Sequence, residues 1–215
     1  MPKFKAFYHI KENYKELLDK NIYELLLCEI MNESKIVFPD KYKQILEQSN
    51  GESDFVSDGG EFLDAKLLFY SQQALNIKKH DIDNFMKSIQ TEQNEVYDTI
   101  VQEKNVSDNL LFVEIKKRLE KMKKNENLII FLPFDVTGEV ENSFFSYCQS
   151  DIFSYIIDEM RREFPLLVNN HIIYMICPNV ENKIVLKCYN KSDYKIEFLH
   201  TDKLRKYIEM RIEMG

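Results

Sequence analysis

Residues 38–51 read FPDKYKQILEQSNG, and the predicted fold depends on how this stretch is interpreted. Asp40 is typical of a helix N-cap, because its carboxylate accepts hydrogen bonds from the free N–H groups of the first turn. Tyr42 and Leu46 follow at helical spacing, and the Asn-Gly pair after Ser49 ends the pattern, since glycine tolerates positive φ. The stretch therefore predicts a short helix from Asp40 to Ser49, with Tyr42 and Leu46 in the core.

The sequence on either side of this stretch predicts an α+β fold. Helical spacing or helical composition is found over residues 11–32, 71–103, 109–124 and 202–214. Runs rich in β-branched and aromatic residues predict strands over 128–134, 172–177 and 183–189. We expect a single domain over residues 1–215, in which a mostly antiparallel sheet is flanked by helices and a helical segment is inserted at about 76–124.

Residues 53–69 predict a β-hairpin, because Asp58-Gly59-Gly60 is a strong turn signal between two strand-like runs. The loop length sets the register, since a shift of one residue moves a side chain to the other face of the sheet. A three-residue loop places Asp54 opposite Asp64 on one face, and Lys66 joins that face. Two carboxylates and a lysine are therefore expected together on adjacent strands.

Composition and charge narrow the classes of partner. The 215-residue chain has a net charge of −7 at pH 7, which does not favour nucleic-acid binding and suits an acidic protein that meets a basic partner. Its four cysteines are widely spaced, at positions 28, 148, 177 and 188. We therefore expect reduced thiols, a cytoplasmic location and no structural zinc. The longest apolar runs are far shorter than a membrane span, so no membrane association is expected.

Two resemblances give different functions, and the first is to the SUKH superfamily. The residues that match the signature helix of this superfamily are Pro39, Tyr42, Leu46, Asn50 and Gly51, and Pro133 and Phe134 resemble an apolar-Pro-Phe segment on a later strand. The resemblance implies a non-enzymatic module without a cofactor. It also implies that the chain binds and neutralises a protein partner, such as a basic toxin domain.

The alternative resemblance is to PD-(D/E)XK nucleases, whose elements follow the order helix, hairpin, helix, strand. Such enzymes hold Mg²⁺ between carboxylates on adjacent strands, next to a lysine that helps to activate water. Asp54, Asp64 and Lys66 match this arrangement, and Glu29 on the first helix offers a further carboxylate. Under this interpretation the chain is an enzyme that acts on nucleic acid. Convergence of Asp54 and Asp64 favours the nuclease, and separate ion pairs favour the binding module.

Overall fold

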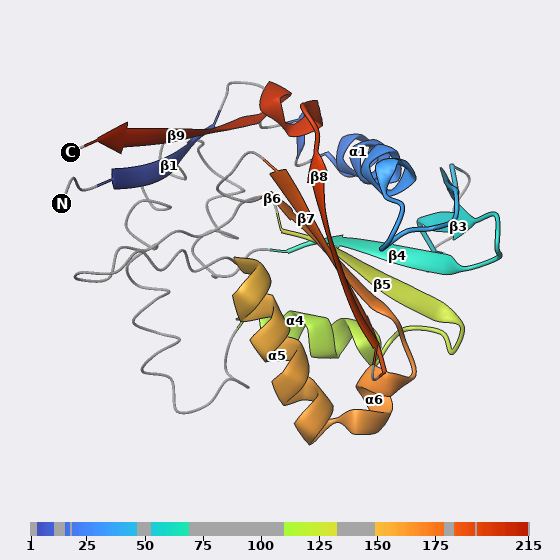
Figure 1. The fold of residues 1–215 in the computed structure, drawn as a ribbon. Helices are drawn as coiled ribbons and strands as arrows, with labels where there is room; N and C mark the ends of the chain where they lie inside the picture. Colours follow the sequence, from blue (N-terminus) through green and yellow to red (C-terminus); the bar gives the residue numbers. More distant parts are fainter. Residues whose placement is uncertain are drawn as a thin grey trace.

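The computed structural model describes residues 4–10, 16–17, 19–46, 53–68, 110–132, 149–178, 183–191 and 193–214. Its centre is a twisted seven-stranded sheet with helices on both faces (Figure 1). The strands lie side by side in chain order: β2 (Tyr42–Gln44), β3 (Phe55–Ser57), β4 (Phe62–Leu67), β5 (Glu126–Phe131), β6 (Ile173–Pro178), β7 (Lys183–Asn190) and β8 (Asp193–His200).

The sheet is mixed, so the α+β prediction is confirmed but the prediction of a mostly antiparallel sheet is wrong. Strands β2, β3 and β4 pair antiparallel, β4, β5 and β6 pair parallel, and β7 and β8 return antiparallel. Parallel neighbours need a crossover connection, and helices occupy those connections here. Helix α4 (Leu110–Leu119) lies between β4 and β5, and helices α5 (Gln149–Glu163) and α6 (Pro165–Asn169) lie between β5 and β6.

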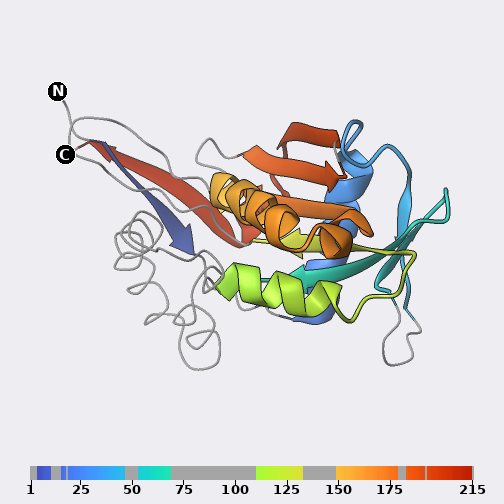
Figure 2. The ribbon, with the colours of Figure 1, turned by 90° about the horizontal axis from the view of Figure 1, so that it is seen from below.

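Helix α1 (Lys20–Glu33) covers one face of the sheet, and helices α4, α5 and α6 cover the other (Figure 2). Alternation along the strands divides the apolar side chains between two cores. Ile129 and Phe131 of β5 belong to the core beneath α1, whereas Leu128 and Ile130 belong to the core beneath α4 and α5. We call these faces the α1 face and the α4–α5 face.

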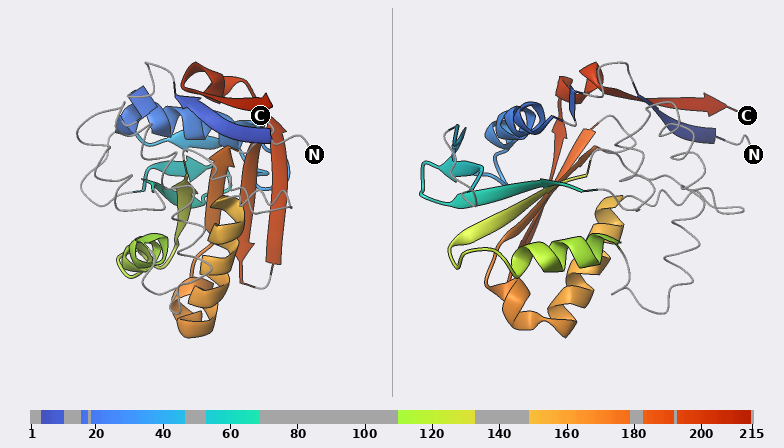
Figure 3. Two further views of the ribbon diagram at one scale, coloured as in Figure 1. Left: turned by 90° about the vertical axis from the view of Figure 1, so that its left-hand side faces the viewer. Right: turned by 180° about the vertical axis from the view of Figure 1, so that it is seen from behind.

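The two ends of the chain form a separate antiparallel ribbon, β1 (Phe4–Ile10) with β9 (Ile208–Met214) (Figure 3). The predicted helix over 202–214 is therefore wrong. The short 3₁₀ helix η3 (Lys203–Lys206) is followed by a strand, because the last residues pair with β1 from the other end of the chain. Within the described ranges, no helix combines the length and apolar character that crossing a membrane requires.

The predicted helix from Asp40 to Ser49 is also wrong over its described part. Tyr42–Gln44 form strand β2, because pairing with β3 outweighs the local helix signals. Tyr42 is buried as predicted, but Leu46 is 83% exposed and lies outside the core.

The remaining residues of the SUKH motif are placed as follows. Pro39 is exposed, and Asn50, Gly51, Pro133 and Phe134 lie outside the described residues. Most of the proposed insertion at about 76–124 also lies outside them.

Candidate functional site

The β3–β4 hairpin has the loop length that the sequence predicts. Ser57 donates its N–H to the carbonyl of Glu61 at 2.9 Å, which leaves three residues in the loop. Phe55 pairs with Leu63 and Val56 pairs with Phe62. Gly60 closes the turn with φ +84, a conformation that favours glycine. The turn therefore brings Asp54 and Asp64 to adjacent strands.

Asp54 immediately precedes β3, and hydrogen bonds of its backbone and of its carboxylate hold it in place. Its N–H donates to the carbonyl of Leu63 at 2.8 Å, and its Oδ2 accepts the Ala65 N–H at 2.6 Å. Its Oδ1 accepts from Lys20 Nζ of helix α1 at 2.8 Å. The side chain is buried, so its position is fixed by the sheet and by the first turn of α1.

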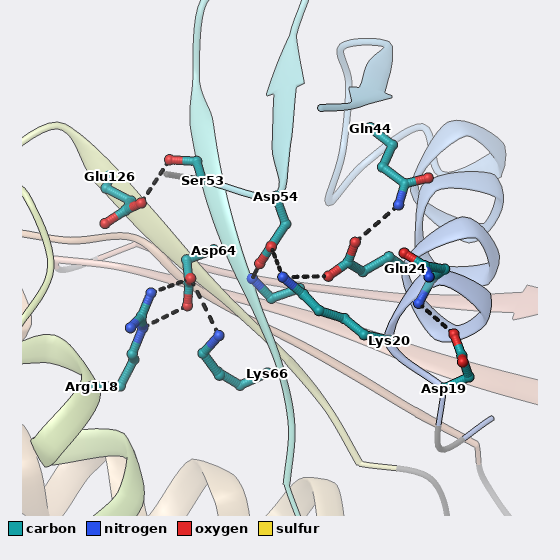
Figure 4. Close-up of polar contacts among 12 residues, drawn as sticks. Asp19, Lys20, Glu24, Gln44, Ser53, Asp54, Asp64, Lys66, Arg118 and Glu126 are labelled. Atoms are coloured by element: carbon teal, nitrogen blue, oxygen red, sulfur yellow. Dashed lines mark hydrogen bonds and ion pairs between the residues drawn. The ribbon is translucent and has the colours of Figure 1, made fainter. Parts of the chain in front are cut away.

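Helix α1 contributes a second buried carboxylate, Glu24, which lies beside the same lysine. Lys20 Nζ is 3.2 Å from Glu24 Oε1, and Gln44 of β2 donates to Glu24 Oε2 at 2.9 Å. Burial raises the pKa of Glu24, and the neighbouring charge of Asp54 raises it further. Two carboxylates thus share one ammonium group at the interface of α1 with the sheet (Figure 4).

Asp64 lies on β4. Its cationic partners lie on the side of that strand that faces away from Asp54 and Lys20 (Figure 4). Arg118 of α4 binds it with two nitrogens: Nε donates to Oδ2 at 2.6 Å, and Nη2 donates to Oδ1. Lys66 Nζ lies 3.4 Å from Asp64 Oδ1. Burial raises the pKa of Asp64 even though Lys66 and Arg118 both act to lower it.

The two strand-borne carboxylates are therefore adjacent in the sheet but are paired separately, Asp54 from the α1 face and Asp64 from the α4–α5 face. The prediction of a common face is wrong for a local reason. Asp54 and Phe55 both face Leu63, as in a β-bulge, so Asp54 leaves the regular alternation of the strand. Lys66 stays beside Asp64 as predicted.

The carboxylate on the first helix is Glu24 and not Glu29. Glu29 is exposed and pairs with Lys203 Nζ at 2.8 Å, on another part of the surface. The sequence spacing indicates that Glu24 lies on the inner face of the first helix, because Leu27 and Met31 follow it by three and seven residues and both are buried. A glutamate within an apolar stripe is thus the feature that identifies this residue.

The site pairs fixed anions with movable cations. Asp54, Asp64 and Glu24 are each at most 2% exposed. The side chains of Lys20, Lys66 and Arg118 are 51%, 34% and 27% exposed, respectively. The carboxylates are therefore held in place, whereas each cation can turn toward solvent or toward a bound anion.

No family model, curated protein or solved structure matches this chain. Within the part of the chain that the structure describes, no group of three or more His, Cys, Asp or Glu residues has the geometry to hold a metal ion.

Proposed function

We propose that this chain is a Mg²⁺-dependent nuclease of the PD-(D/E)XK type, in which Asp54, Asp64 and Lys66 form the active site. One observation carries the proposal. Helix α1, the β3–β4 hairpin, α4 and β5 follow in the expected order, with Asp54 immediately before β3 and Asp64-Ala65-Lys66 on β4. The separate ion pairs of Asp54 and Asp64 favour the binding module by the criterion given above, so the proposal requires that the metal displaces Lys20 and Arg118 and draws the two carboxylates together. Glu24 takes the position on the first helix that sequence analysis gave to Glu29.

The donor set suits a hard divalent cation. Mg²⁺ takes carboxylate oxygens and keeps several waters, so one or two protein carboxylates can hold it. The Oε1 atom of Glu24 is buried and accepts no hydrogen bond of good geometry. Burial also raises the pKa values of Glu24 and Asp64, as expected where anions are gathered for a cation. A bound Mg²⁺ would polarise a phosphodiester and lower the pKa of a bound water.

The protein side chains have separate roles in this proposal. Asp54 and Asp64 would hold the metal once it had displaced Lys20 and Arg118, and Ala65 donates its N–H to Asp54. Lys66 is two residues after Asp64 on the same strand, so its ammonium group faces the same side and can orient water or a phosphate oxygen. Arg118 would release Asp64 to the metal and turn to the substrate phosphate.

Helix α4 and the residues after it carry several cations, although the whole chain is acidic and Glu114 and Glu120 lie among them. Helix α4 carries Arg118, and the exposed lysines that follow the helix are Lys121, Lys123 and Lys124. Phosphate contacts of this kind supply much of the affinity of nucleic-acid binding proteins.

The test is cleavage of single- and double-stranded DNA and RNA by the purified chain, with Mg²⁺ or Mn²⁺ and with EDTA. We expect metal-dependent cleavage that falls at least about 100-fold in Asp64→Asn and in Lys66→Met, since the proposed ligand and charge are lost. Asp58→Asn is the matched control, because Asp58 is an exposed carboxylate in the same hairpin. Absence of cleavage by the wild type on all four substrates would refute the proposal, and so would full activity of Asp64→Asn.

A second candidate is the non-enzymatic binding module that neutralises a basic toxin domain. Its support is that Asp54 and Asp64 already have separate cationic partners, so the hairpin is electrostatically satisfied without a metal. Tyr42–Gln44, which were predicted to lie in the signature helix of the SUKH motif, form strand β2. The separate ion pairs are therefore the main support for the binding module. This candidate predicts no metal-dependent cleavage, together with one-to-one binding to a purified basic toxin domain.

A further inference from the structure

Strand β8 forms one edge of the seven-stranded sheet. All eight of its residues, Asp193–His200, pair with β7. Within the described ranges, no strand pairs with its outer edge. A long open edge presents free N–H and C=O groups, which are a template for another strand.

A row of apolar side chains lies along this edge strand. Tyr194, Ile196 and Phe198 are 47%, 39% and 52% exposed. They are two residues apart and therefore share one face of the sheet. Ile196 is in register with Lys187, whose Nζ donates to Ser154 of α5, so the row lies on the α4–α5 face.

The opposite face of β8 carries Lys195 and Glu197, one cation and one anion. Glu197 is buried, and it accepts from Ser34 Oγ at 2.5 Å and from the N–H groups of Ile36 and Val37 at 3.1 Å each. Its position is therefore fixed by the loop that follows α1. Lys195 is exposed.

We propose that β8 pairs antiparallel with β8 of a second copy of this chain, with Ile196 on the two-fold axis. In this register Tyr194 faces the partner's Phe198, and Ile196 faces its own counterpart. On the other face Lys195 faces the partner's Glu197, whose carboxylate already accepts hydrogen bonds within its own chain, so the apolar pairs carry most of the pairing. Apolar pairs and opposite charges directly across a strand pair each favour pairing.

Charges favour this register over the two adjacent registers, in which the two-fold axis passes through Lys195 or through Glu197. An axis at Lys195 places two lysines opposite each other and sets Asp193 opposite Glu197. An axis at Glu197 places two buried carboxylates opposite each other. Like charges across a strand pair are destabilising, so Ile196 is the favoured centre.

The interface is small, which sets the expected affinity. An edge of eight residues with three half-exposed apolar side chains buries less than the roughly 1,200 Å² of a typical stable interface. We therefore expect a reversible dimer whose population rises with protein concentration across the micromolar range.

Sedimentation velocity of the full chain over a concentration series tests the dimer. We expect the wild type to shift from the mass of one chain to that of two, and Ile196→Lys to weaken association at least about tenfold, because two lysines then meet at the axis. Leu166→Lys is the control, since Leu166 is 81% exposed on α6 and should leave association unchanged. A wild type that stays monomeric would overturn the proposal, as would an Ile196→Lys variant that dimerises like the wild type.

Oxidative cross-linking tests the register independently. Directly opposite Cα atoms in antiparallel strands lie about 4.5–5.5 Å apart, within reach of a disulfide. Ile196→Cys should therefore give a covalent dimer above the wild-type background, whereas Tyr194→Cys should not, because it faces the partner's Phe198. Equal cross-linking of both variants would contradict the register.

Discussion

The ion pair between Arg118 and Asp64 is the contact whose removal is most informative. Arg118→Met keeps most of the side-chain volume and removes the charge, which leaves a buried carboxylate with Lys66 at 3.4 Å. Removing one partner of a buried pair costs about 3–5 kcal/mol. Because the Arg118 side chain is 27% exposed and Lys66 remains, we expect a smaller cost, about 2–3 kcal/mol of the free energy of unfolding at pH 7.

The same substitution should strengthen metal binding if Asp64 is a ligand. In the wild type a divalent ion has to displace Arg118, whereas in Arg118→Met the carboxylate is already released. A ligand at one hundred times its Kd stabilises the folded state by about 2.7 kcal/mol, close to the loss expected from the substitution. Mn²⁺ should therefore restore most of the lost stability of the variant and stabilise the wild type less.

The assay is urea unfolding followed by far-UV circular dichroism, with Mn²⁺ and with EDTA. Arg162→Met is the matched control, because Arg162 is exposed and pairs with Glu159 within α5, so its loss should cost less than about 0.5 kcal/mol. If Arg118→Met is as stable as the wild type, the pair does not hold Asp64 as described. If Mn²⁺ stabilises both proteins equally, Arg118 does not compete with the metal.

The pH dependence of this variant follows from the pKa of Asp64. Burial raises that pKa in the folded state, and loss of Arg118 removes a cation that lowers it. A carboxyl group whose pKa is higher in the folded than in the unfolded protein destabilises the folded state most at a pH above both pKa values, where it is charged in both states. The stability deficit of Arg118→Met should therefore shrink as the pH falls through the pKa of Asp64, as urea titrations at several pH values would show.

Four further substitutions test other parts of the fold by urea unfolding. Glu197→Gln should cost about 1–3 kcal/mol at pH 7. Burial alone would raise the pKa of Glu197, but its hydrogen bonds lower it below its usual value, so the wild-type advantage should be lost as the pH falls through that lowered pKa. Gly60→Ala should cost about 1 kcal/mol because φ is +84, whereas Gly59→Ala should cost less, since its Cβ would meet an exposed aspartate side chain that can rotate. Tyr174→Phe removes a hydroxyl that donates to Glu61 at 2.8 Å and should cost about 1–2 kcal/mol; no change would exclude that bond as a stabilising contact.

The features that sequence analysis predicted correctly are local. The three-residue loop before Glu61 follows from Asp58-Gly59-Gly60, because turn chemistry depends on neighbouring residues alone. Strand β5 and the buried strands β6 and β7 follow from their β-branched and aromatic composition.

The features that it missed depend on contacts between distant residues. Tyr42–Gln44 carry helix signals but form a strand through pairing with β3, and the last residues form β9 through pairing with β1. The cations of the candidate site are also distant, since Lys20 is 34 residues from Asp54 and Arg118 is 54 residues from Asp64. No spacing rule relates such pairs, and the bulge at Asp54 likewise becomes visible only once β3 and β4 are paired.

The most direct test of the central claim is calorimetric titration of Mn²⁺ into the wild type, Asp64→Asn and Asp58→Asn. The claim that Asp54 and Asp64 hold a divalent ion predicts saturable binding by the wild type and by Asp58→Asn, and a loss of at least about tenfold in affinity in Asp64→Asn. Undetectable binding to the wild type at millimolar Mn²⁺, or equal binding by all three proteins, would contradict it.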